Sequence, residues 1–330
     1  MSYHVFGIGN ALVDMEYEVE ETFLTENSIE KGLMTLIDES QQQQLSAGLE
    51  SAYGVKKRTG GGSAANTIVA ISMLGGKSFY ACKVADDEGG DFYMNDLKEA
   101  GVTTRLDRAS YQGITGKCMV MVTPDAERTM NSFLGITSDF SEDELHLDEL
   151  KKAEYIYSEG YLVTSDVSRA AVISARKFAA ENGIKTAITF SDPSMVTYFK
   201  DGITEIIGDG VDILFSNEEE ATTYTGKDNI DDAIVELKKL TGTLVLTLGD
   251  KGAKVITDNE QISIAPVKTT AVDTNGAGDM FAGSFLYGVT HGFDLQKAGD
   301  LASEAASIIV SRFGTRLEAD EQAHLRAKYC

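Results

Sequence analysis

Beyond residue 150 the chain alternates between short apolar runs and longer stretches with the period of an amphipathic helix. The apolar runs cover residues 154–157, 186–190, 212–215 and 243–248, and the helical patterns cover 167–181, 231–240, 277–288 and 295–313. Such alternation is typical of parallel strands joined by helices that pack on both faces of one sheet. The connections should be right-handed, and ligands should bind at the carboxyl ends of the strands. We therefore predict an α/β fold with three layers, α/β/α, around a mainly parallel sheet.

The first half of the chain contains the same kinds of pattern, interrupted by two β-rich segments. Strand patterns at 3–8 and 79–84 and helical patterns at 63–74 and 90–100 extend the large sheet. Residues from about 13 to 40 and from about 112 to 135 read instead as short strands without crossover helices. We expect these two segments to form a small β lid that projects from the sheet. No linker rich in Pro or Ser divides the chain, so residues 1–330 should form a single domain.

The composition limits the partners of the chain. Its formal net charge of -23 disfavours nucleic acid and anionic membranes as partners. An anionic ligand would need local compensation from backbone N–H groups, a metal ion or a few placed cations. Cys82, Cys118 and Cys330 are far apart and lack metal-binding spacing, which is typical of a protein in the reduced cytoplasm. No apolar run approaches the ~18 residues that a membrane span needs, so we expect a cytoplasmic protein.

A glycine-rich loop near the C-terminal end carries the strongest chemical signal. Residues 273–279 read Asp-Thr-Asn-Gly-Ala-Gly-Asp and lead directly into a helical pattern. Glycines at a helix start let backbone N–H groups approach an anion, and the helix dipole adds positive potential there. Asp279 would repel a phosphate, but it could act as a general base beside an anion hole, which phosphoryl transfer to a hydroxyl requires. The alternative is a capped helix start with Asp273 or Thr274 as the N-cap.

This loop resembles the signature Asp-Thr-x-Gly-Ala-Gly-Asp of the ribokinase-like (PfkB) family of carbohydrate and nucleoside kinases. The resemblance implies a ribokinase-like fold and an enzyme that transfers the γ-phosphoryl group of ATP to a primary hydroxyl. Asp279 would take the hydroxyl proton, and the N–H groups of Gly276, Ala277 and Gly278 would hold the developing charge. The family likeness also implies Mg²⁺ and, near this loop, a monovalent cation such as K⁺.

Two glycine-containing motifs in the first half of the chain match the acceptor site of that family. Gly-Ile-Gly-Asn at 7–10 follows the first strand pattern, and Gly-Gly-Gly-Ser-Ala-Ala-Asn at 60–66 opens a helical one. By themselves both could be plain turns, and the first lacks the third glycine of the dinucleotide fingerprint, which disfavours an oxidoreductase. The resemblance assigns them to binding of the acceptor, through the residues Asn10, Asp14, Gly61, Gly62, Ser63 and Asn66.

Further motifs match the nucleotide side. Asn-Glu-Glu-Glu at 217–220 fits the family's Asn-x-x-Glu, although an acidic run at a helix start is usually dipole compensation. Thr-Leu-Gly-Asp-Lys-Gly at 247–252 fits its nucleotide loop, and a later helix would wall the adenine. Mg²⁺ often keeps several waters, so we expect Asn217 and Glu220 to act on it through water. The residues expected at the nucleotide are Asn217, Glu220, Thr247, Gly249, Gly252, Asp273, Thr274 and Ala306.

The segment Glu-Arg-Thr-Met-Asn-Ser-Phe-Leu-Gly at 127–135 resembles the adenosine-kinase-like branch of the family, as do residues 31–37 and 191–193. A lone Arg128 in an acidic chain is usually half of a surface ion pair, but phosphoryl transfer needs a cation. The resemblance places Arg128 at the transferred phosphate and has Met130 and Ser132 face the substrate base. The neighbourhood of Met34, Met130 and Phe133 favours an apolar contact with a base.

These features favour the 5′-hydroxyl of adenosine as acceptor, giving AMP in purine salvage. A free sugar such as ribose, fructose or 2-keto-3-deoxygluconate is the alternative, and it would need a small polar pocket. A non-catalytic metabolite-binding protein on the same fold is disfavoured, because Asp279 and the glycines beside it are intact. The sequence leaves open whether the chain is a monomer or a homodimer.

Overall fold

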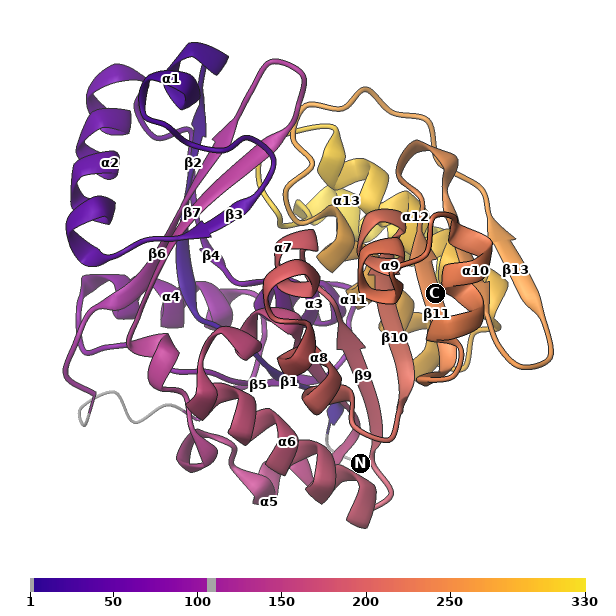
Figure 1. Cartoon of the computed structure of the whole chain (residues 1–330). Helices are drawn as coiled ribbons and strands as arrows, with labels where there is room; N and C mark the ends of the chain where they lie inside the picture. Colours follow the sequence, from indigo (N-terminus) through magenta and orange to yellow (C-terminus); the bar gives the residue numbers. More distant parts are fainter. Residues whose placement is uncertain (1–2, 106–110) are drawn as a thin grey trace.

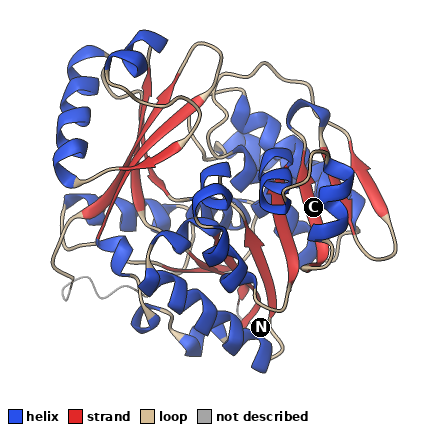
Figure 2. Ribbon diagram, viewed as in Figure 1, coloured by secondary structure: helices blue, strands red, loops and turns tan. Residues whose placement is uncertain are grey.

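The computed structural model describes residues 3–105 and 111–330, and it contains two sheets of different size (Figure 1, Figure 2). The large sheet has eight strands in the order β13-β12-β11-β10-β9-β8-β1-β5. The neighbouring pairs from β11 to β5 are parallel, while β12 and β13 add an antiparallel edge. The strands are β1 (Tyr3–Ile8), β5 (Ser78–Ala81), β8 (Ala153–Glu159), β9 (Lys185–Thr189), β10 (Val211–Asn217), β11 (Thr241–Thr247), β12 (Ala253–Ile256) and β13 (Gln261–Ile264). The prediction of a mainly parallel sheet is confirmed.

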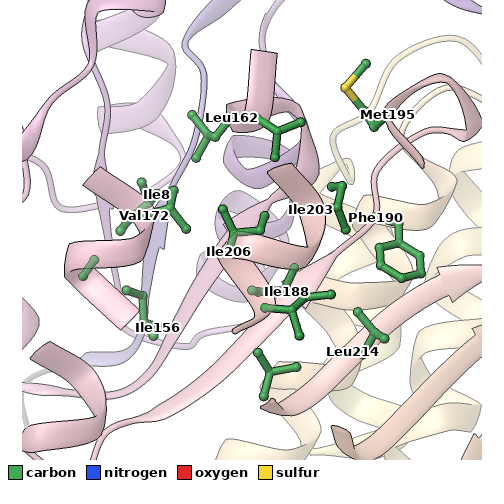
Figure 3. Packing of buried hydrophobic residues seen from close by; sticks show 14 of the residues in the cluster. Ile8, Ile156, Leu162, Val172, Ile188, Phe190, Met195, Ile203, Ile206 and Leu214 are labelled. Atoms are coloured by element: carbon green, nitrogen blue, oxygen red, sulfur yellow. The ribbon is translucent and has the colours of Figure 1, made fainter. Parts of the chain in front are cut away.

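Helices cover both faces of the large sheet. Side chains alternate between the two faces along each strand, so both faces present apolar residues that the helices bury. On one face Ile156, Ile188 and Leu214 pack beneath a first layer of helices (Figure 3). On the other face Tyr157 and Phe215 pack against a second layer. The first layer consists of α5 (Leu147–Leu150), α6 (Asp166–Glu181), α7 (Pro193–Tyr198), α8 (Lys200–Ile207), α9 (Glu218–Thr225) and α10 (Ile230–Leu237). The second consists of α3 (Ser63–Met73), α4 (Glu88–Glu99), α11 (Ala277–Thr290) and α12 (Leu295–Val310), with α13 (Ala319–Tyr329) packed on α12.

The small sheet forms the lid and has five strands in the order β3-β7-β6-β2-β4, paired both parallel and antiparallel. On one face Tyr17, Met119 and Met121 pack against two helices, which lie on the outer side in Figure 1. The opposite face carries Asp14 and Arg128 and lies over the carboxyl ends of the large sheet. The elements are β2 (Leu12–Glu18), β3 (Met34–Leu36), β4 (Lys57–Gly61), β6 (Thr115–Val122), β7 (Arg128–Gly135), α1 (Glu21–Glu26) and α2 (Glu39–Ala52).

The structure departs from the sequence expectations mainly in and beside the lid. β4 lies outside the two segments expected to form it, because its sequence Lys-Arg-Thr-Gly-Gly has no apolar alternation. Helix α1 interrupts the segment expected to hold only strands. The helical pattern at 295–313 ends at Val310, after which residues 311–317 turn beneath the glycine-rich loop. Within the described ranges, no helix has both the length and the apolar character that crossing a membrane requires.

Candidate active site

A cavity of about 220 Å³ lies where the large sheet meets the lid. The last residues of four parallel strands line it: Glu159, Thr189, Asn217 and Thr247. Parallel strands present their carboxyl ends at one edge, so this position agrees with the expectation for an open α/β sheet. The residues predicted from the sequence that line this cavity are Asn10, Asp14, Gly62, Ser63, Asn66, Arg128, Met130, Ser132, Asn217, Glu220, Thr247, Thr274, Gly276, Gly278 and Asp279.

Asp279 lies in the first turn of α11 with its carboxylate held by two donors from α3. Ser63 Oγ donates to Oδ1 at 2.6 Å, and Asn66 Nδ2 donates to Oδ2 at 2.9 Å. Burial raises the pKa of Asp279, while these two hydrogen bonds and the charge of Arg128 oppose the rise. A fixed carboxylate with a raised pKa is a better proton acceptor than a free aspartate, so this geometry suits a general base.

The start of α11 is built without a side-chain cap. Gly276 occupies the N-cap position with φ of 72°, and no side chain accepts from the first turn. Asp273 Oδ1 accepts instead from Asn275 N at 2.8 Å, and Thr274 Oγ1 donates to Ala126 O at 3.3 Å. The capped-start alternative is therefore wrong. The first N–H groups of a helix have no intrahelical acceptor, so this end of α11 can receive an anion.

Asp14 and Asn10 both line the cavity, as predicted. The Asp14 carboxylate fits because residue 61 is glycine: a Cβ there would lie 2.0 Å from it. Gly61 thus makes room for Asp14 rather than lining the cavity itself. Burial and the neighbouring Glu16 raise the pKa of Asp14 well above its usual value. A buried carboxylate open to a cavity is suited to accept hydrogen bonds from ligand hydroxyls.

Glu159 is a site residue that the sequence analysis missed. It is fully buried, and its two carboxylate oxygens accept from Asn10 N at 2.8 Å and Ala64 N at 2.6 Å. It therefore joins the loop that carries Asn10 to the start of α3. Burial raises the pKa of Glu159 to about 7, against the effect of the two N–H donors. The available signal was its place as a charged residue two positions after the predicted strand at 154–157, where site residues of an α/β fold collect.

Arg128 points from the lid strand β7 into the cavity. Among residues 3–105 and 111–330, the one hydrogen bond of its guanidinium goes to Met130 Sδ at 3.4 Å. Burial opposes its charge, but Tyr161, Asp192 and Asp279 together raise its pKa. The alternative interpretation, that Arg128 is half of a surface ion pair, is therefore wrong. A cation without a hydrogen-bonded carboxylate can bind an incoming anionic group.

Asn217 and Glu220 also line the cavity, where they cap α9. Asn217 Oδ1 accepts from Glu220 N at 2.8 Å, and Asn217 Nδ2 donates to Glu220 Oε1 at 2.9 Å. Burial raises the pKa of Glu220 to about 8. Within the described part of the chain, no three His, Cys, Asp or Glu residues are grouped so that they could hold a metal ion. The two residues fit a hydrated Mg²⁺ that is held mainly by water and phosphate oxygens.

The other predicted nucleotide and anion-hole residues lie outside the cavity lining. Gly249 and Gly252 form the turn after β11, and Ala306 is half-buried on α12 against the second core cluster. Asp273 is buried beneath the loop, and Ala277 N donates to Thr274 O at 3.3 Å. Gly249 and Gly252 follow the cavity residue Thr247 in the chain, and Asp273 and Ala277 flank the cavity residue Thr274.

The lid side of the cavity is largely apolar. Met34 and Met130 line it as expected, but Phe133 does not. Side chains alternate along β7, so Phe133 points away from the face that carries Arg128, Met130 and Ser132, and Leu134 lines the cavity instead. The apolar residues on the lid side are Leu12, Met34, Leu36, Cys118, Met130 and Leu134.

Comparison with known proteins agrees with this geometry. Residues 39–322 match the pfkB family of carbohydrate kinases. Adenosine kinase from Saccharomyces cerevisiae is 28% identical over 327 residues, which cover 93% of this chain and 94% of that protein. The structure of adenosine kinase from Sinorhizobium meliloti is similar with a TM-score of 0.93 and 33% identity, covering 99% of this chain and 100% of that one. A probable sugar kinase from Rhizobium etli CFN 42 is similar with a TM-score of 0.94 and 30% identity, covering 100% and 99%. This chain thus belongs to the pfkB family of carbohydrate kinases and is a phosphotransferase that acts on alcohol groups.

Proposed function

We propose that the chain is an ATP-dependent adenosine kinase, which phosphorylates the 5′-hydroxyl of adenosine to give AMP. The observation that carries the proposal is the division of the cavity into two chemical halves. Asn10 and Asp14 offer polar groups to the hydroxyls of a ribose, while Met34, Met130 and Leu134 offer an apolar wall. A nucleoside presents hydroxyls and a flat apolar base in the same way, whereas a free sugar has no group that needs the wall.

In the proposed reaction, Asp279 accepts the proton of the attacking hydroxyl while Ser63 and Asn66 hold its carboxylate in place. The N–H groups at the start of α11, from Gly276 to Gly278, stabilise the charge on the transferred phosphoryl group, and Arg128 adds its charge from the lid. Thr247, Gly249, Gly252, Thr274 and Ala306 border the nucleotide. Mg²⁺, near Asn217 and Glu220, would neutralise charge on the phosphates.

The monovalent cation implied by the family fits the buried side of the 273–276 loop. Asp273 is 1% exposed, and its Oδ2 has no hydrogen-bond partner among the described residues. A buried carboxylate oxygen without a donor has the hard-oxygen chemistry that K⁺ requires. Turnover in KCl compared with an equal concentration of choline chloride tests this assignment.

Two further points follow from the fold. Because α1 and α2 already cover the outer face of the lid, we infer that the chain needs no second copy there and can act as a monomer. The three cysteines are free, which agrees with the reduced cytoplasm that a nucleoside-salvage kinase would occupy.

Release of ADP in the presence of MgATP tests the acceptor directly. The panel contains adenosine, inosine, guanosine, ribose, fructose and 2-keto-3-deoxygluconate. We expect turnover with adenosine and little with the free sugars. The sugar-kinase alternative is supported by the probable sugar kinase from Rhizobium etli at 30% identity. Turnover with a sugar and none with adenosine would overturn the nucleoside assignment and leave the family unchanged.

A further inference from the structure

A buried arginine lies beneath the acceptor site, on the turn that follows α12. Arg316 is 9% exposed, and its Nη2 donates to the carbonyl oxygen of Gly60 on β4 and, at 2.9 Å, to Asp96 Oδ2 on α4. Its Nε and Nη1 are buried without a hydrogen-bond partner in the described part of the chain. Arg316 thus forms an ion pair with Asp96 through Nη2, while the other two guanidinium nitrogens have no partner among the described residues. A buried cation of this kind acts on the charges around it through a low-dielectric interior.

The contact with β4 places Arg316 at the residue before Gly61, the glycine that makes room for Asp14. A Cβ on Gly60 would lie 2.5 Å from Asp96 Oδ2, and a Cβ on Gly61 would lie 2.0 Å from the Asp14 carboxyl. The Arg316 guanidinium, Asp96 and Asp14 therefore all border one dipeptide of the lid, Gly60–Gly61. Movement of the guanidinium would move this dipeptide and the space that Asp14 occupies.

Thr315, the residue before Arg316, is linked to the proposed base Asp279 by hydrogen bonds through Asn66. Thr315 Oγ1 donates to Asn66 Oδ1 at 3.1 Å, and Asn66 Nδ2 donates to Asp279 Oδ2 at 2.9 Å. Thr315 also packs against Gly276, where a Cβ would lie 2.5 Å from Thr315 Cγ2. Residues 315 and 316 thus contact the lid, α3 and the start of α11 together.

We propose that Arg316 is a positioning residue for phosphoryl transfer, which fixes the Gly60–Gly61 dipeptide and places a buried positive charge that favours the carboxylate forms of Asp14 and Asp279. It acts through those two residues, since it does not line the cavity itself. The inference rests on the acceptor and base roles proposed for them above.

The charges around the two carboxylates agree with this role. Burial raises the pKa of Asp14 and of Asp279, and Arg316 opposes the rise at both. Arg128 opposes it at Asp279 from the lid side. The groups that face Asp14 are Glu16, Asp96, Cys118, Asp279 and Arg316. The groups that face Asp279 are Asp14, Ser63, Asn66, Arg128, Tyr157, Glu159, Tyr161 and Arg316.

The test is the pH dependence of kcat/KM for ADP release in Arg316→Met and Arg316→Lys. We expect Arg316→Met to move the acid limb of the kcat/KM profile to higher pH by about one unit, because both carboxylates lose a favourable charge. At a fixed pH on that limb, kcat/KM should fall about tenfold. Arg316→Lys keeps the charge and should restore the position of the limb, while a raised KM would report the lost guanidinium geometry. If Arg316→Met does not fold, Arg316→Gln removes the charge but keeps hydrogen-bond donors for Gly60 and Asp96, and it is measured in its place with the same expected shift.

Arg58→Met is the matched control, since Arg58 also joins β4 to α4. It pairs with both carboxylate oxygens of Glu88, at 2.8 and 2.7 Å, on the solvent side of the same strand. Loss of Arg58 should weaken this link without moving the acid limb. If Arg316→Met leaves the acid limb where Arg58→Met leaves it, Arg316 is a structural brace and the proposal is wrong.

A second readout separates this outcome from a wrong acceptor or base. In protein labelled with ¹³C-aspartate, NMR titration follows the two carboxyls without any acceptor, and Asp14→Asn and Asp279→Asn assign their signals. We expect both to titrate at higher pH in Arg316→Met. Unchanged titration would overturn the proposal. Shifted titration in a protein that phosphorylates no acceptor of the panel would uphold the effect of Arg316 on the two carboxyls and reject the proposed function instead.

Discussion

Replacing Gly276 by alanine should damage stability and catalysis together. The φ of 72° at this position costs a residue with a Cβ about 1–2 kcal/mol. The new Cβ would also lie 2.5 Å from Thr315 Cγ2 and 2.8 Å from Thr315 Cβ. Overpacking at a buried position costs about 1–3 kcal/mol, so the total is about 3 kcal/mol. With an unfolding entropy of ~2.1 cal/mol/K per residue, a chain of 330 residues should lose about 4 °C in Tm.

The same substitution should lower kcat by about 10²-fold. Thr315 is held by Asn66, which also holds Asp279, so the strain cannot relax at Thr315 without moving the proposed base. A small misplacement of a base or an anion hole has an effect of about this size. Thermal unfolding followed by circular dichroism and ADP release measure the two effects on the same preparation.

Gly278→Ala is the matched control, two residues further along the chain. A Cβ on Gly278 meets no atom within 4 Å, and alanine favours a helix over glycine by about 1 kcal/mol. Stability should therefore be kept or slightly raised. Because Gly278 lines the cavity, the added methyl group would stand where we place the phosphates, and kcat/KM should still fall. A wild-type Tm in Gly276→Ala would refute the strain argument, and full activity in Gly278→Ala would refute the anion site.

Three further substitutions test the remaining parts of the site. Asp279→Asn should reduce kcat by about 10²–10⁴-fold while calorimetry shows unchanged ATP binding; surviving turnover would mean that another group is the base. Arg128→Met should reduce kcat by about 10²-fold and Arg128→Lys by less, because the charge remains; equal losses would mean that the planar fork matters more than the charge. The pKa of Glu159 is raised from 4.5 to about 7, so the folded state binds its proton more tightly than the unfolded state. The resulting contribution to the free energy of unfolding is fully present below about pH 4.5 and is lost as pH rises through about 7. The difference in unfolding free energy between wild type and Glu159→Gln should change by about 3 kcal/mol across this window, and a difference that does not vary with pH would contradict the raised pKa.

Much of the large sheet could be predicted because each of its parallel strands is an apolar run next to a helical pattern. The lid was predictable only in part. In β4, two glycines allow Asp14 and Asp96 to approach the backbone closely. A strand that packs in this way has no alternating apolar side chains, so its sequence shows no hydrophobic period. The hairpin of β12 and β13 was likewise missed, since each strand is only four residues long.

Motif residues close in sequence to glycines were predictable, whereas residues that act across the fold were not. Glu159 contacts Asn10 and Ala64, which are 149 and 95 residues away, and Arg316 contacts Gly60 at a separation of 256. Neither sits in a motif with a chemical pattern of its own. Their importance depends on which backbone groups the folded chain brings to them, and a sequence pattern carries no information about such partners.

The lid must be more than a cover, because it carries groups for both halves of the proposed reaction. Asp14 on β2 belongs to the acceptor side, and Arg128 on β7 belongs to the phosphate side. Strand β6 pairs with both β2 and β7, so the three strands form one hydrogen-bonded unit. In the proposed reaction we therefore expect a bound acceptor that engages Asp14 also to hold Arg128 at the phosphate. Without an acceptor the lid has one contact fewer, Arg128 is less well placed, and transfer of the phosphoryl group to water is disfavoured.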